Sequence, residues 1–162
     1  MFYNSEFIFV IYTDGSSNPQ LKTGAWAAII LQDQNKISLS GLEINTTHNR
    51  MELTAGIKAL EYLQSHYKKI NLIQIYTDSQ YMVGLTSRKD KVISANFTTK
   101  KGVPVRNEDL VKTLLNQIET MPVKFIKVRA HQKKTEIINY NTEVDKLARK
   151  LVRDKIKKDL FR

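Results

Sequence analysis

Four carboxylate side chains lie at positions where a charged group does not favour folding but could bind a metal or take part in catalysis. Asp14 and Asp78 each follow an apolar run, and both end a Tyr-Thr-Asp segment. Glu52 lies in line with the apolar stripe of a predicted helix, and Asp145 lies beside the stripe of another. A buried carboxylate is costly unless it meets a cation or hydrogen-bond donors. Convergence of the four acids on one cation would account for their positions.

Each acid also has an ordinary structural explanation. Asp14 suits a turn, and Asp78 could cap the helix that follows it. Glu52 stands three residues after Asn49, in the pattern of a capping box, and Asp145 stands three residues after a threonine. Taken one at a time, the acids do not distinguish a cap from a ligand.

Taken together, the acids indicate a cation. Carboxylates that converge on a sheet edge repel and raise one another's pKa unless a cation lies between them. Mg²⁺ prefers oxygen ligands and is often completed by substrate phosphate. Two such ions about 3.5–4 Å apart would promote in-line phosphodiester hydrolysis.

The pattern of apolar residues predicts an α/β fold that could bring these acids together. Strands are expected over residues 7–12, 24–31, 36–44, 72–77 and 123–130. Helices are expected over residues 50–65, 79–85, 107–118 and 142–158. If the two Tyr-Thr-Asp strands are parallel neighbours, Asp14 and Asp78 emerge at the same edge, where ligand sites of open α/β sheets gather.

The composition narrows the class of function. The chain has 162 residues and no cysteine, which excludes disulfides and thiolate chemistry. Its formal net charge of +10 favours a polyanionic partner, although solvated lysine faces explain it equally well. The opening apolar run is too short to span a bilayer, so we expect a soluble, cytoplasmic protein.

Four segments resemble the type 1 ribonuclease H family and occur in that family's order. These segments are Tyr12–Ser16, Thr46–Leu53, Tyr76–Tyr81 and Asn141–Ala148. The resemblance implies a five-stranded mixed sheet, with three antiparallel strands, then two parallel ones, and helices on both faces. It implies a single catalytic domain over residues 1–162.

The resemblance also implies roles for particular residues. Asp14, Glu52, Asp78 and Asp145 match the family's metal-binding catalytic carboxylates. His131 matches a mobile catalytic histidine that shuttles protons or assists product release, a role suited to an imidazole titrating near neutral pH. A surface-loop histidine is the alternative for that residue.

Three amides match positions that reach the minor groove of a hybrid duplex in this family, where 2′-hydroxyls distinguish RNA from DNA. They are Asn18, Asn49 and Gln80, each of which could instead be a plain turn or cap residue. His48 stands where asparagine is common, which predicts an altered groove contact.

Residues 86–106 have the length and position of the family's basic protrusion, which grips substrate outside the catalytic cleft. Lys100 and Lys101 lie in this segment and are candidate substrate-binding residues. A solvated lysine loop is the alternative.

The sequence thus predicts an endonuclease that hydrolyses the RNA strand of RNA–DNA hybrids by two-metal-ion catalysis, leaving 5′-phosphate and 3′-hydroxyl ends. Two Mg²⁺ ions are expected with substrate, with Mn²⁺ as an alternative, and the chain is expected to act as a monomer. The alternatives are a hybrid-binding module without catalysis and another nuclease of the same fold, such as a junction resolvase.

Overall fold

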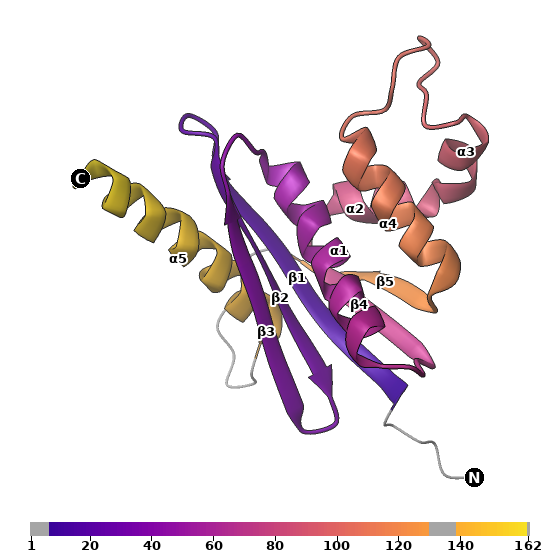
Figure 1. Cartoon of the computed structure of the whole chain (residues 1–162), viewed down its shortest axis with the longest axis horizontal. Coiled ribbons are helices and arrows are strands. Elements are labelled where there is room, and N and C mark those ends of the chain that lie inside the picture. Colours follow the sequence, from indigo (N-terminus) through magenta and orange to yellow (C-terminus); the bar gives the residue numbers. More distant parts are fainter. Residues whose placement is uncertain (1–6, 130–138, 162) are drawn as a thin grey trace.

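The architecture is a five-stranded sheet covered by helices (Figure 1), seen in a computed structural model that describes residues 7–129 and 139–161. The strands are β1 (Ile8–Asn18), β2 (Thr23–Gln32), β3 (Asn35–Glu43), β4 (Leu72–Thr77) and β5 (Val123–Lys127). The helices are α1 (His48–His66), α2 (Gln80–Ser87), α3 (Lys89–Ser94), α4 (Glu108–Thr120) and α5 (Tyr140–Leu160).

The strands run in the spatial order β3-β2-β1-β4-β5. The pairs β1–β2 and β2–β3 are antiparallel, whereas β1–β4 and β4–β5 are parallel. This arrangement confirms the predicted mixed sheet, with the two Tyr-Thr-Asp strands as parallel neighbours. It places β1 in the middle of the sheet, between an antiparallel and a parallel partner.

Apolar side chains are buried on both faces of the sheet, as predicted. On one face, Ala28 and Ile30 of β2 belong to the main core, with leucines of α1 and α4. On the other face, Ala27 and Ile29 pack with Val144 and neighbouring residues of α5. Because side chains alternate along a strand, β2 serves both cores and is apolar almost throughout.

The structure differs from the prediction at the ends of several elements and in one short helix. β5 ends at Lys127, short of the expected residue 130, and α5 begins at Tyr140, two residues before the expected start. The first strand continues from Tyr12 to Asn18, because its last residues still pair with Thr23–Ala28 of β2. Asp14 therefore lies inside β1 and not at its end. The short helix α3 was not predicted, because it has six residues, no buried side chain and no side-chain cap.

Within the residues that the structure describes, no helix is both long enough and apolar enough to cross a membrane.

Candidate metal-dependent active site

The parallel pairing of β1 and β4 brings two of the acids side by side. Tyr12 is in register with Tyr76, so Asp14 and Asp78, each two residues further on, emerge at the same sheet edge. β4 ends at Thr77, and Ser79 caps α2 by accepting a hydrogen bond from the Met82 amide at 3.1 Å. Asp78 is thus not the cap of α2 and is free to face the site.

Glu52 reaches the same point from α1. Thr47 caps this helix, with its hydroxyl accepting from the Arg50 amide at 3.3 Å, so the capping-box explanation with Asn49 is wrong. Gly15 lets α1 approach β1 closely: a Cβ there would lie only 2.5 Å from the Glu52 backbone nitrogen. The absent side chain on β1 is what allows the Glu52 carboxylate to sit beside Asp14.

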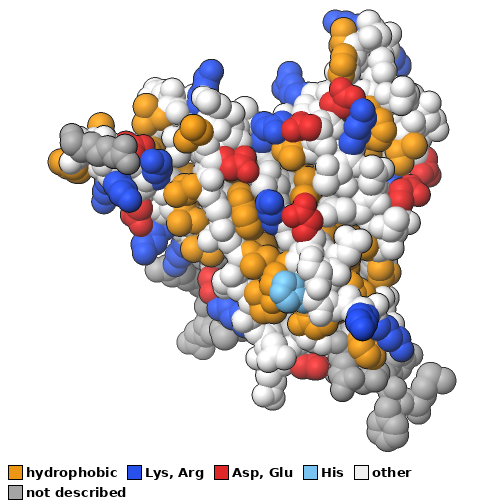
Figure 2. Space-filling model, in the orientation of Figure 1, with side chains coloured by type: hydrophobic (Ala, Val, Ile, Leu, Met, Phe, Trp, Pro, Cys, Tyr) orange, Lys and Arg blue, Asp and Glu red, His pale blue; other side chains and the backbone are white. Residues whose placement is uncertain are grey.

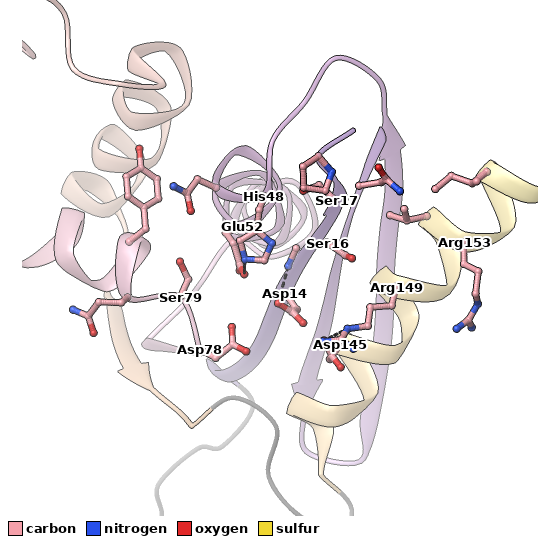
Figure 3. Close-up of a pocket in the computed structure, with 18 of the residues that line it drawn as sticks. Asp14, Ser16, Ser17, His48, Glu52, Asp78, Ser79, Asp145, Arg149 and Arg153 are labelled. Atoms are coloured by element: carbon pink, nitrogen blue, oxygen red, sulfur yellow. Dashed lines mark hydrogen bonds and ion pairs between the residues drawn. The ribbon is translucent and has the colours of Figure 1, made fainter. Parts of the chain in front are cut away.

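The carboxylates of Asp14, Glu52 and Asp78 form one cluster, and Figure 3 shows them pointing toward one another. One oxygen from each lies within 4.8 Å of the others. Asp14 is 3% exposed and Glu52 only 1%, so two of the three are removed from water. Such a group of oxygens has the chemistry of a site for a hard divalent cation.

The buried oxygens of Glu52 support that interpretation. His48 Nε2 lies 3.1 Å from Oε1, but among the described residues neither oxygen accepts a hydrogen bond of good geometry. Asp14 is better provided for, because its Oδ1 accepts from the Gly15 amide at 2.9 Å. Since buried polar groups are almost always paired, a bound cation would satisfy oxygens that the surrounding donors leave without a hydrogen bond.

The electrostatics of the cluster also require positive charge. Burial, followed by the charges of Glu52 and Asp78, raises the pKa of Asp14 far above its usual range. Burial, followed by the charge of Asp78, likewise raises the pKa of Glu52. Desolvation and like charge both disfavour the ionised forms, and a cation among the oxygens would reverse both effects.

Asp145 reaches the site from α5 but lies outside the cluster of three. Its carboxyl faces Asp14, while its Oδ1 accepts from Arg149 Nε at 3.0 Å. Asn139 caps α5, accepting from the amides of Asn141 and Thr142, so the proposed capping box from Thr142 to Asp145 is wrong. Asp145 is 29% exposed and belongs to the wall of the site.

The acids lie in an open cleft of about 1020 Å³. Three predicted substrate-binding residues line it: Asn18 at the end of β1, Asn49 on α1 and Gln80 at the start of α2. Asn18 also organises its own loop, because its Oδ1 accepts from the amides of Gln20 and Leu21, both at 3.0 Å. The turn explanation and the cleft position are therefore both correct for Asn18.

Two predicted residues are exposed and do not line the cleft. Lys100 and Lys101 lie in the turn closed by the Thr98–Pro104 bridge, in the segment that projects at the upper right of Figure 1. The base of that segment is anchored, because Phe97 packs against the main core and Lys112 Nζ lies 5.3 Å from the centre of its ring. His131 lies outside the described residues.

Sequence reasoning missed the contribution of α5 to the cleft wall. Arg149, Arg153 and Lys157 all line the cleft. Their spacing of four residues could have shown that they share a face of the final helix, but only the fold reveals that this face turns toward the acids.

An ion pair fixes the helix that carries Glu52. Arg50 donates to both carboxylate oxygens of Asp109 on α4, at 2.9 and 2.8 Å. This bidentate contact lowers the pKa of Asp109 to about 2, chiefly through the hydrogen bonds from Arg50. It ties the first turn of α1 to the first turn of α4, two residues from the metal-site glutamate.

A mixed sheet of this order, with carboxylates from β1, from α1 and from the residue after β4 gathered together, defines a metal-dependent nuclease of the RNase H-like fold. The sequence model of the RNase H family matches residues 7–153. The ribonuclease H of Caldanaerobacter subterraneus subsp. tengcongensis is 34% identical over 158 residues, which cover 96% of this chain and 98% of that protein. The ribonuclease HI of Rickettsia prowazekii is 34% identical over 140 residues, covering 86% of this chain and 87% of the relative.

Solved structures agree in fold. LC9-RNase H1, a type 1 RNase H with the type 2 active-site motif, superposes with a TM-score of 0.75 at 21% identity, covering 91% of this chain and 72% of that one. A foamy viral protease–reverse transcriptase in complex with double-stranded DNA superposes with a TM-score of 0.72 at 20% identity, covering 91% of this chain and 96% of that one. The chain therefore belongs to the RNase H family, and its activity is that of a ribonuclease H, a metal-dependent endoribonuclease.

Proposed function

We propose that this protein hydrolyses the RNA strand of RNA–DNA hybrids, leaving 5′-phosphate and 3′-hydroxyl ends. The observation that carries the proposal is the cluster of Asp14, Glu52 and Asp78, whose oxygens lie within 4.8 Å of one another at the floor of an open cleft. Membership of the RNase H family supports hybrid duplex as the substrate.

The cation that suits this site is Mg²⁺, held by Asp14, Glu52 and Asp78, with Asp145 as a further carboxylate at the cleft wall. Two ions are expected when substrate is bound, and Mn²⁺ is the natural alternative. Bound ions of this kind activate water and stabilise negative charge on the phosphoryl and leaving oxygens. The all-oxygen set of side chains and the absence of cysteine from the sequence favour such a hard cation.

The residues around the acids position the duplex and keep the reacting bond in place. The Asn18 side-chain oxygen is occupied by loop amides, so its NH₂ group is the part left to donate to substrate. Asn49 and Gln80 offer amide groups from α1 and α2, suited to 2′-hydroxyls and base edges in the minor groove. His131 is proposed as the proton carrier that serves the leaving group or the departing product.

The basic segment 86–106 is proposed to grip the duplex away from the reacting bond. Lys100 and Lys101 on its exposed turn would contact phosphates without reading sequence. We propose that residues 1–162 act as one catalytic domain and as a monomer; the single family match over residues 7–153 supports one domain.

The test is cleavage of an end-labelled RNA–DNA hybrid in Mg²⁺, compared with single-stranded RNA, double-stranded RNA, double-stranded DNA and an EDTA control. Cutting confined to the RNA of the hybrid and abolished by EDTA is expected. Hybrid that is bound but left intact in Mg²⁺ would instead indicate a binding module. In that case a four-way DNA junction becomes the next substrate to try.

A further inference from the structure

Helix α5 contributes more to the cleft than its one acid. Arg149, Arg153 and Lys157 line the cleft over successive turns, with the apolar Val152 and Ile156 between them. Residues four apart on a helix share a face and are separated by about 6 Å along its axis. The cleft therefore has a row of cations along one wall, which begins beside Asp145 and leads away from the acids.

The three cations of this row differ in whether each already has an ion-pair partner. Arg149 is paired with Asp145, so its charge is partly engaged within the site. Arg153 and Lys157 are exposed, and neither side chain makes an ion pair or a hydrogen bond within residues 7–129 and 139–161. Figure 3 shows Arg153 on α5 beyond Arg149, on the side of the cleft opposite α2. These two cations thus have no partner in the described part of the protein.

We propose that Arg153 and Lys157 bind phosphates of the strand that is cut, several nucleotides to the α5 side of the scissile bond. The inference rests on the proposed hydrolysis of hybrid duplex. The strand is the cleaved one because the row is continuous with the acids through the Arg149–Asp145 pair. Arginine suits a phosphate through its planar fork and lysine as a point charge, and a basic groove of this kind tracks a backbone without reading bases.

The placement of the two basic surfaces supports this assignment. The segment 86–106 and α5 stand on opposite sides of β1 and β4 in Figure 1. Blue Lys and Arg side chains occur over both in Figure 2. A duplex held only by the segment 86–106 would be fixed on one side of the reacting bond. Contacts from α5 would fix it on the other side as well.

The test compares two double variants that lose the same charge from the same helix. Arg153→Ala/Lys157→Ala removes the cleft-facing cations, whereas Lys150→Ala/Lys158→Ala removes two exposed cations that do not line the cleft. Binding of a fluorescent hybrid is measured in Mg²⁺ over a range of salt concentrations. An Asp14→Asn background keeps the hybrid intact. Hydrolysis by the same double variants is then measured with Asp14 restored.

The cleft-facing pair is expected to weaken binding about tenfold at low salt and to reduce the slope of log affinity against log salt by about 1.8, as two lost phosphate contacts on a duplex require. Hydrolysis should show a raised KM with kcat nearly unchanged, because the acids are untouched. The Lys150/Lys158 pair should leave the salt slope unchanged. Equal losses for the two pairs would overturn the inference, since only general charge would then be involved.

Shortened hybrids locate the contact. When the duplex is shortened at the end that lies over α5, wild type and the Arg153→Ala/Lys157→Ala variant should bind equally. When it is shortened at the opposite end, their difference in affinity should remain. A difference that survives both truncations contradicts the assignment. If the unmodified protein neither binds nor cuts hybrid, the proposed function itself fails, and that outcome is visible before any α5 variant is compared.

Discussion

Replacing Asp14 with asparagine is expected to stabilise the metal-free protein while abolishing hydrolysis. The substitution keeps the side-chain oxygen that accepts from the Gly15 amide at 2.9 Å, so the local geometry is preserved. It also removes a group that would add a third negative charge to the site when ionised. At a separation of 4.8 Å, an effective dielectric constant of about 20 gives a repulsion of about 3.5 kcal/mol for each pair of ionised carboxylates, so folding must either meet this cost or keep Asp14 protonated.

The effect should depend on pH with a definite sign. The folded protein raises the pKa of Asp14 from its ordinary 3.8 to about 9, so between these values the folded state binds more protons than the unfolded state. The free energy of unfolding of the metal-free protein therefore falls as pH rises through this range. Asp14→Asn removes that dependence, so its stability advantage over the wild type should grow with pH and be greater near pH 8 than near pH 5 by at least about 2 kcal/mol.

The assay is urea denaturation followed by circular dichroism, in EDTA and in Mg²⁺, at several pH values. Mg²⁺ should stabilise the wild type strongly and the variant weakly, because binding to the folded state alone raises stability by mass action. Asp154→Asn, which removes an exposed carboxylate that does not line the cleft, is the control and should change stability by less than about 0.5 kcal/mol. An Asp14→Asn protein less stable than wild type near pH 8 in EDTA would refute the reasoning.

Three further predictions follow from the neighbours of the cluster. Gly15→Ala should destabilise the protein by about 3 kcal/mol and slow hydrolysis, because the added Cβ would lie 2.5 Å from the Glu52 backbone nitrogen. Thermal denaturation measures the loss of stability, and hybrid cleavage measures the loss of activity. Asp145→Asn should abolish or sharply reduce cleavage yet change metal-free stability by less than about 1 kcal/mol, since Asp145 is 29% exposed and paired with Arg149; urea denaturation in EDTA provides the comparison with Asp14→Asn. Asp109 has a lowered pKa, about 2 against an ordinary 3.8, so its contribution to folding stability is present above pH 4 and is lost as pH falls toward 2. The difference in the free energy of unfolding between wild type and Asp109→Asn should be below about 1 kcal/mol at neutral pH and should shrink between pH 4 and pH 2, as measured by urea denaturation.

The sequence identified the acids but not how they meet. Repeated Tyr-Thr-Asp segments after apolar runs predicted parallel strands, and the register of Tyr12 with Tyr76 confirms that they are neighbours. Glu52 was recognisable because a carboxylate stood in line with an apolar stripe. What brings it to Asp14 is the close approach of α1 over Gly15, a tertiary contact that no helical pattern encodes.

The caps were the least predictable feature. Asn49 and Thr142 had the right spacing for capping boxes, yet Thr47 and Asn139 cap the helices. Several polar residues near a helix start can satisfy its free amides, and tertiary packing selects among them. The short helix α3 escaped prediction for another reason, because six residues with only Val92 and Ile93 packed against the core are too few to show an apolar periodicity.

The wall formed by α5 could not have been assigned from sequence alone. Basic residues recur along the final helix on several of its faces, and a charge-rich helix is usually just solvated. Only the packing of Val144 and Ala148 against β2 determines which face turns toward the acids. The roles of His131, Asn49 and Gln80 stay predictions that require substrate.

The central claim is that the carboxylate cluster is the catalytic metal centre. Glu52→Gln tests it most directly, because Glu52 is buried in the cluster and glutamine keeps the shape of the side chain while removing its charge. Hydrolysis of a labelled RNA–DNA hybrid in Mg²⁺ is compared with that of wild type, with folding verified by circular dichroism. A folded Glu52→Gln protein whose rate has fallen by at least about 100-fold is predicted. A folded variant that cuts hybrid within about tenfold of the wild-type rate would contradict the account, since loss of a metal ligand should cost more than that.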